Sequence, residues 1–200
     1  MLEKKALTKQ QIAEIIAKRW SCRSFNPDKK VSREDIISIC EAARWAPSCF
    51  GDEPWNFIIC DKFHNKISWE LALDCLGEWN QNWAKNAPVL IISLALKVFR
   101  KNGKENRWSK YDTGAACENI CLQAIELGLM AHQMGGFEEN KVIANFDILD
   151  NFDIMSIIAV GYQDKADKLN EELYKLEISE RKRRLLGDNF FDSEMNNPIA

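Results

Sequence analysis

Two arginines and a serine alternate in the stretch "RWSCR" at residues 19–23. If this stretch is extended, residues two apart point to the same side, so Arg19, Ser21 and Arg23 share a face while Trp20 and Cys22 turn inward. Two planar guanidinium groups and a hydroxyl suit a phosphomonoester better than a carboxylate. The pattern predicts a phosphate clamp. The alternative is a pair of solvated arginines that complement a helix dipole, and spacing alone favours that alternative.

A second basic group lies near the other end of the chain, in "ERKRRLLG" at residues 180–187. Taken alone, it reads better as the solvated basic end of a charged tail helix. Two basic groups that flank one core are more informative than either, because they could meet around a single phosphate. The loop "APSCFGDEPW" at residues 46–55 offers backbone amides and short side chains, which would suit a planar ring or serve only as a connector.

The composition limits the classes of function. The 200 residues carry a formal net charge of -3 and 46% hydrophobic residues, which is typical of one globular domain without a basic field for nucleic acid or anionic membranes. Seven cysteines without a CxxC pair, and no signal peptide, indicate reduced thiols in a cytoplasm. The apolar run at residues 89–96 is too short to span a bilayer. His64 and His132 lack partners at metal-ligand spacing, so we expect no metal.

Hydrophobic periodicity and turn signals predict alternating helices and strands. We expect helices at about residues 8–19, 32–46, 63–86, 112–127 and 138–145, and strands at residues 55–60, 89–96, 130–134 and 155–162. The strand at 89–96 is the best candidate for a buried central strand. From Asp164 the chain is highly charged, with a narrow apolar seam of Ala166, Leu169, Leu173 and Leu176. No GxGxxG or phosphate-loop motif appears, so a nucleotide-binding doubly wound unit is not expected.

The order of several segments resembles the nitroreductase family of flavin-dependent oxidoreductases, from about Thr8 to Leu186. These segments are "RWSCRSF", "ISICEAARWAPSCFGDEPWNFIIC", "NAPVLIIS", "DTGAACENICLQAIELGLMAHQMGGF", "IIAVGY" and "ERKRRLL". The resemblance implies an α+β fold, a three-layer α-β-α sandwich, that binds FMN at the interface of a homodimer whose C-terminal arm is exchanged. It divides the chain into an FMN-binding core at residues 1–163 and, within the same domain, a charged helix and C-terminal arm at 164–200.

The resemblance also implies the cofactor-binding residues. The clamp residues Arg19, Trp20, Ser21 and Arg23 match the family's phosphate motif, and Arg181 with Arg183 match its C-terminal basic pair, although Lys182 or Arg184 would replace them if the register slips by one. Ser48 and Cys49 fall where the family's loop approaches the flavin ring, and Met134, Gly135 and Gly136 match a turn whose backbone amide points at flavin N5. In that loop Gly51 and Glu53 stand where the family has asparagine and glutamine, so an amide donor to the flavin ring is lost.

The activity implied by the resemblance is transfer of electrons from NAD(P)H through flavin N5 to a nitroaromatic or quinone acceptor by a ping-pong scheme. The flavin carries the redox chemistry, so no catalytic side chain is expected. The changes at Gly51 and Glu53 motivate a second hypothesis, a flavin-binding carrier or sensor without efficient turnover. A third is a different flavin chemistry, such as reductive dehalogenation or flavin fragmentation.

Overall fold

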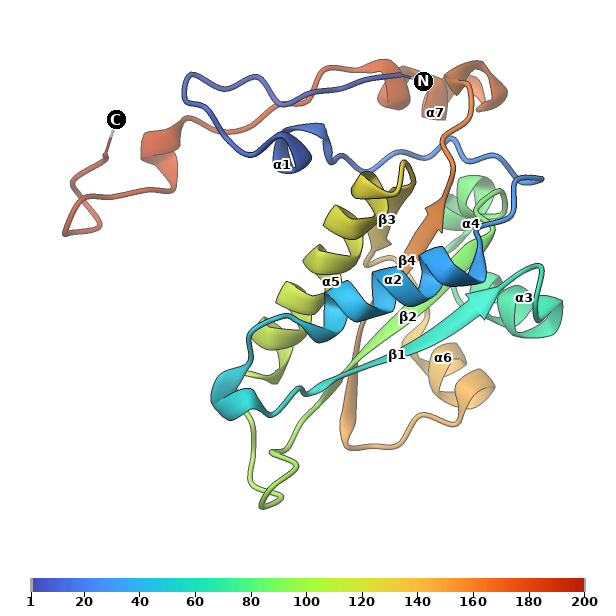
Figure 1. The fold of residues 1–200 in the computed structure, drawn as a ribbon, viewed down its shortest axis with the longest axis horizontal. Helices are drawn as coiled ribbons and strands as arrows, with labels where there is room; N and C mark the ends of the chain where they lie inside the picture. Colours follow the sequence, from blue (N-terminus) through green and yellow to red (C-terminus); the bar gives the residue numbers. More distant parts are fainter. Residues whose placement is uncertain (1, 200) are drawn as a thin grey trace.

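A four-stranded antiparallel sheet forms the middle layer of the computed structural model, which describes residues 2–199 (Figure 1). The strands are β1 (Trp55–Asp61), β2 (Val89–Leu96), β3 (Met130–Met134) and β4 (Phe152–Gly161), in the order β1-β2-β4-β3. All eight residues of β2 are buried, since the strand has neighbours on both edges and helices on both faces. The predicted central strand is therefore confirmed, as is the three-layer α+β sandwich.

One face of the sheet is covered by α2 (Arg33–Arg44) and α5 (Ser109–Glu126). The hydroxyl of Ser32 accepts a hydrogen bond from the Asp35 amide at 2.9 Å and caps α2. Small buried residues of α5, among them Ala116 and Ala124, let this helix pack closely against the sheet. Gly128 takes the left-handed conformation (φ 71°) just past α5, as expected for the residue that ends a helix.

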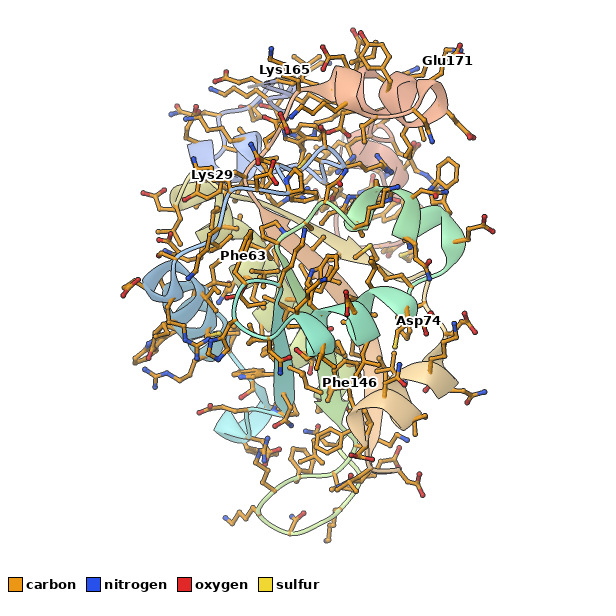
Figure 2. The ribbon with its side chains drawn as sticks, turned by 90° about the vertical axis from the view of Figure 1, so that its right-hand side faces the viewer. Lys29, Phe63, Asp74, Phe146, Lys165 and Glu171 are labelled. Atoms are coloured by element: carbon orange, nitrogen blue, oxygen red, sulfur yellow. The ribbon has the colours of Figure 1, made fainter. Side chains whose placement is uncertain are left out.

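The opposite face carries α3 (Lys66–Asp74), α4 (Glu78–Ala84) and α6 (Glu139–Phe146), as the positions of Asp74 and Phe146 show in Figure 2. The helix expected over residues 63–86 is in fact two helices. The break falls at Gly77, whose amide donates to the Gly136 carbonyl at 3.0 Å. Trp83 of α4 is fully buried and stacks with Phe25 and His132, so this layer holds the segment that follows residue 23 in place.

The end of β4 has no room for a side chain at Gly161. A Cβ built there would lie 2.4 Å from Cδ of Pro88 and 3.2 Å from a ring carbon of Phe25. The absent side chain lets β4 lie against the turn into β2, one residue before Tyr162, whose carbonyl accepts from the Asn26 amide. The packing of Gly161 therefore brings the segment around residue 25 to the sheet.

The expected helix over residues 8–19 is wrong in length. Only Glu14–Lys18 are helical (α1), and the Thr8 hydroxyl donates to the Gln10 carbonyl instead of capping a helix. Ile12 and Ile16 are 38% and 50% exposed, so the apolar spacing that predicted the helix has no surface to pack on. A short helix without such packing is marginal in water.

The charged tail folds as two short pieces, not as one seam. A 3-10 turn (η2, Ala166–Lys168) is followed by α7 (Glu171–Ile178), which Asn170 caps by accepting from the Leu173 amide. Figures 1 and 2 place α7 at the end of the molecule near the N-terminal segment, far from α6. Beyond α7 the chain runs out from the sandwich and contains one further 3-10 turn (η3, Leu186–Asp188). Between residues 2 and 199, no helix is both long and apolar enough to cross a membrane.

Candidate functional site

The stretch at residues 19–23 leaves α1 with extended backbone at Arg19 (φ -62°, ψ 125°). Trp20 and Cys22 are buried, as the alternation predicted. Arg19, Ser21 and Arg23 line a cavity of about 330 Å³, to which Trp20 also contributes. The three predicted clamp residues therefore lie around one cavity, and their role as a phosphate clamp stays a prediction.

Both ends of the chain contribute to this cavity, which we call the basic pocket. It is lined by Lys4, Arg19, Trp20, Ser21, Arg23, Leu176, Ser179, Glu180, Arg181 and Arg183. Five of these side chains are basic and one is acidic. The structure therefore unites the two basic groups that the sequence separates, and it selects Arg181 and Arg183 over Lys182 and Arg184 as lining residues.

The basic side chains of the pocket are only partly neutralised by protein groups. Arg19 Nε lies 3.3 Å from Glu118 Oε1, whereas Arg181 donates to the carbonyls of Lys4 and Ala17 at 2.7 and 2.9 Å. Burial, followed by the charges of Arg19 and Arg183, lowers the pKa of the Arg181 guanidinium. Nε of Arg23 is buried without a partner among the described residues. A pocket with this excess of donors and positive charge is suited to an anion.

Two side chains behind the clamp fix its backbone. Glu177 of α7 is fully buried and accepts hydrogen bonds from the amides of Arg23 and Ser24. His132 Nδ1 lies 2.9 Å from the Cys22 carbonyl, so this nitrogen carries the proton and donates it. Burial, and then the charges of Arg23 and Arg19, lower the pKa of His132 to about 4, which keeps the ring neutral. His132 is thus a partly buried histidine whose ring is hydrogen-bonded within the protein.

Sequence reasoning missed Lys4 and Glu177. Glu177 lies four residues after the buried Leu173, so its position on the inner face of α7 was the one available signal. Lys4 precedes every recognisable motif, and its place in the pocket depends on the path of the N-terminal segment. No spacing rule indicates that path.

The loop at residues 48–53 is held rigidly at the N-terminal end of α5. Cys49 donates its amide to the buried Asp112 carboxylate at 2.9 Å, and the Ser48 hydroxyl accepts from the Glu53 amide at 3.1 Å. Phe50, Gly51 and Glu53 all have positive φ angles of 51–65°. The side chain of Phe50 is 93% exposed, so the loop presents a phenyl ring to solvent.

The remaining predicted site residues lie at the end of β3 and just after it. Met134 is buried in the core that faces α4, and its side chain packs there. Gly135 and Gly136 follow at the surface, where the Gly136 carbonyl accepts from the Gly77 amide and from Asn80 Nδ2, both at 3.0 Å. Neither this turn nor the loop at 48–53 lines the basic pocket. A single chain therefore does not bring all the predicted residues into one cavity.

No group of three or more histidine, cysteine, aspartate or glutamate side chains in residues 2–199 is arranged to hold a metal ion. The buried cysteines of α5 have raised pKa values because of burial, to about 12 for Cys121, so they remain thiols.

Comparisons with known proteins agree with the fold. A solved structure of an oxidoreductase containing FMN is 30% identical, with a TM-score of 0.87 and coverage of 96% of both chains. An FMN-dependent nitroreductase from Clostridium difficile R20291 is 28% identical, with a TM-score of 0.63 over 76% of this chain and 87% of that one. A protein of Staphylococcus aureus (strain USA300) named "Putative NAD(P)H nitroreductase" is 26% identical, and the match covers 81% of this chain and 91% of that protein.

The α+β sandwich is thus an architecture shared with a solved oxidoreductase that contains FMN. The model of the nitroreductase family matches residues 16–162. The chain belongs to the nitroreductase family.

Proposed function

We propose that the protein is an FMN-dependent oxidoreductase that passes electrons from NAD(P)H to nitroaromatic or quinone acceptors. The observation that carries this proposal is the basic pocket, in which residues from both ends of the chain surround a space for one phosphomonoester. Membership of the nitroreductase family and the FMN-containing relatives support the choice of FMN.

The residues of the pocket fit the phosphate of FMN. Arg19, Ser21 and Arg23 offer guanidinium and hydroxyl donors, and the unpartnered Nε of Arg23 gains an acceptor when a phosphate is bound. Arg183 contributes a further cation from the tail. One guanidinium nitrogen of Arg181 already donates hydrogen bonds to two backbone carbonyls. Arg181 therefore adds positive charge and also ties the tail to the N-terminal segment. Bound FMN supplies the two-electron redox chemistry, while the protein binds, orients and shields.

The ring-binding part of the site is completed by a second copy of the chain in this proposal. Ser48, Cys49, Gly51 and Glu53 lie outside the pocket that holds the phosphate, as does the turn of Met134, Gly135 and Gly136. The segment after α7 exposes five large apolar side chains: Leu185, Leu186, Phe190, Met195 and Ile199. Such a segment is suited to embrace a partner, so we assign residues 164–200 as an arm of the same domain that is exchanged in a homodimer.

The proposal is tested by the released cofactor and by turnover. The purified protein should carry FMN and not FAD, and the FMN-loaded protein should oxidise NADH or NADPH with menadione or nitrofurazone faster than free FMN does. A ping-pong scheme gives parallel double-reciprocal lines when both substrates are varied. FMN binding without turnover above free FMN would instead identify a carrier or sensor, and failure to bind FMN would refute both.

A further inference from the structure

The carboxylate of Glu177 is buried behind the clamp. Among the described residues, it is the only acidic group there that accepts hydrogen bonds from the backbone of the clamp. Its two oxygens accept from the Arg23 amide at 3.1 and 3.0 Å, and one of them also accepts from the Ser24 amide at 3.1 Å. The side chain is fully buried, and burial raises its pKa while the Arg23 and Ser24 amides oppose that shift. A buried carboxylate is costly unless it is hydrogen-bonded in this way.

The same residue ties three separate segments together. The Lys4 ammonium donates to the Glu177 carbonyl at 2.8 Å. The backbone carbonyl of Lys4 in turn accepts from the guanidinium of Arg181, four residues after Glu177 in the tail. The clamp, the N-terminal segment and the tail therefore meet at Glu177. Arg23 cannot shift its backbone without giving up the hydrogen bonds to this carboxylate.

We propose that Glu177 is a positioning residue of the basic pocket, which holds the backbone of Arg23 and Ser24 so that the Arg23 guanidinium meets the ligand's phosphate. This inference rests on the proposed function, because it requires the pocket to bind the phosphate of FMN. Glu177 lies behind the clamp and does not line the pocket, so it acts through Arg23.

A positioning role and a purely electrostatic role predict opposite changes in FMN affinity when the charge of Glu177 is removed. A negative group behind a phosphate site repels the phosphate, so neutralising it would strengthen FMN binding if charge alone mattered. If Glu177 positions Arg23, neutralisation instead weakens binding. In Glu177→Gln an amide NH2 replaces one acceptor oxygen and faces the donating backbone amides.

The experiment compares FMN with riboflavin, which has the same ring and side chain but no phosphate. Dissociation constants for both are measured by quenching of flavin fluorescence on apoprotein. We expect wild-type protein to prefer FMN, and Glu177→Gln to lose about tenfold or more in FMN affinity with riboflavin affinity unchanged. Glu172→Gln is the matched charge control, since Glu172 is exposed on the same helix, does not line the basic pocket and touches neither amide. It should not weaken FMN binding.

Glu177→Asp keeps the charge but shortens its reach by one methylene, and it should also weaken FMN selectively. If Glu177→Gln does not fold, this variant gives the same readout. Exchange of the Arg23 and Ser24 amides should be slow in wild-type protein and faster in either variant.

The outcomes separate this inference from the proposed function. An unchanged or increased preference for FMN in Glu177→Gln, an equal loss for FMN and riboflavin, or a loss in Glu172→Gln would overturn the positioning role while leaving the FMN site intact. Wild-type protein that does not discriminate FMN from riboflavin would refute the phosphate site itself, and the positioning role with it.

Discussion

Acid should weaken the fold through His132, the partly buried ring that supports the clamp. Its pKa falls from the ordinary 6.5 to about 4 in the folded protein, because burial disfavours the charged ring. Because the pKa is lower in the folded protein than in the unfolded chain, the neutral ring stabilises the fold at pH values above the unfolded pKa of 6.5. This stabilisation is lost as the pH falls towards 4. The linkage relation gives a loss of about 2 kcal/mol at about pH 5 and about 3 kcal/mol at about pH 4.

The assay is urea unfolding of wild-type protein and His132→Gln from about pH 7 to about pH 4. Glutamine still has an N–H group to donate to the Cys22 carbonyl but does not titrate in this range. The variant therefore loses some packing on Trp83 at neutral pH, yet its stability should fall less with acid. Subtracting the two curves cancels the carboxylates that both proteins share.

His64 provides the matched control. It lies in the exposed turn after β1, so His64→Gln should leave the pH profile unchanged. Parallel profiles for wild-type protein and His132→Gln would refute the reasoning, since they would mean that His132 titrates alike in the folded and unfolded states.

Three further changes test other parts of the structure. Arg23→Ala removes charge-assisted hydrogen bonds to the phosphate and should weaken FMN binding by about 1.5 to 3 kcal/mol in a fluorescence titration, whereas Arg33→Ala on the exposed side of α2 should not. Gly161→Ala places a Cβ 2.4 Å from Pro88 and should lower the free energy of unfolding by about 1–3 kcal/mol in urea. Asp112→Ala leaves the Cys49 amide without its acceptor and should cost about 1–3 kcal/mol by the same method, with faster amide exchange in the loop at 48–53.

The local patterns that predicted structure well are those whose partners lie close in sequence or inside the sheet. The run of β2 was read as a central strand because every residue is apolar or small, and each one is buried. The alternation at residues 19–23 predicted which side chains turn inward, since a period of two follows from extended backbone. Ser32 predicted the start of α2 through a cap that needs only three residues.

The features that the sequence did not predict correctly depend on contacts between residues far apart in the chain. The apolar spacing in residues 8–19 indicated a helix, but its exposed isoleucines have no surface to cover. Lys4 and Glu177 reach the clamp through the paths of two terminal segments, which no local periodicity encodes. The sequence likewise could not show that the loop at 48–53 and the turn at 134–136 lie outside the basic pocket. The arrangement of the strands in the sheet sets the distance between these segments and the pocket, and no local pattern encodes it.

A crystal structure of the flavin-loaded protein tests the central claim most directly. We expect one phosphate in the basic pocket, in contact with Arg19, Ser21 and Arg23 from one end of the chain and with Arg183 from the other. A flavin phosphate bound elsewhere, with these side chains turned to bulk water, would contradict it.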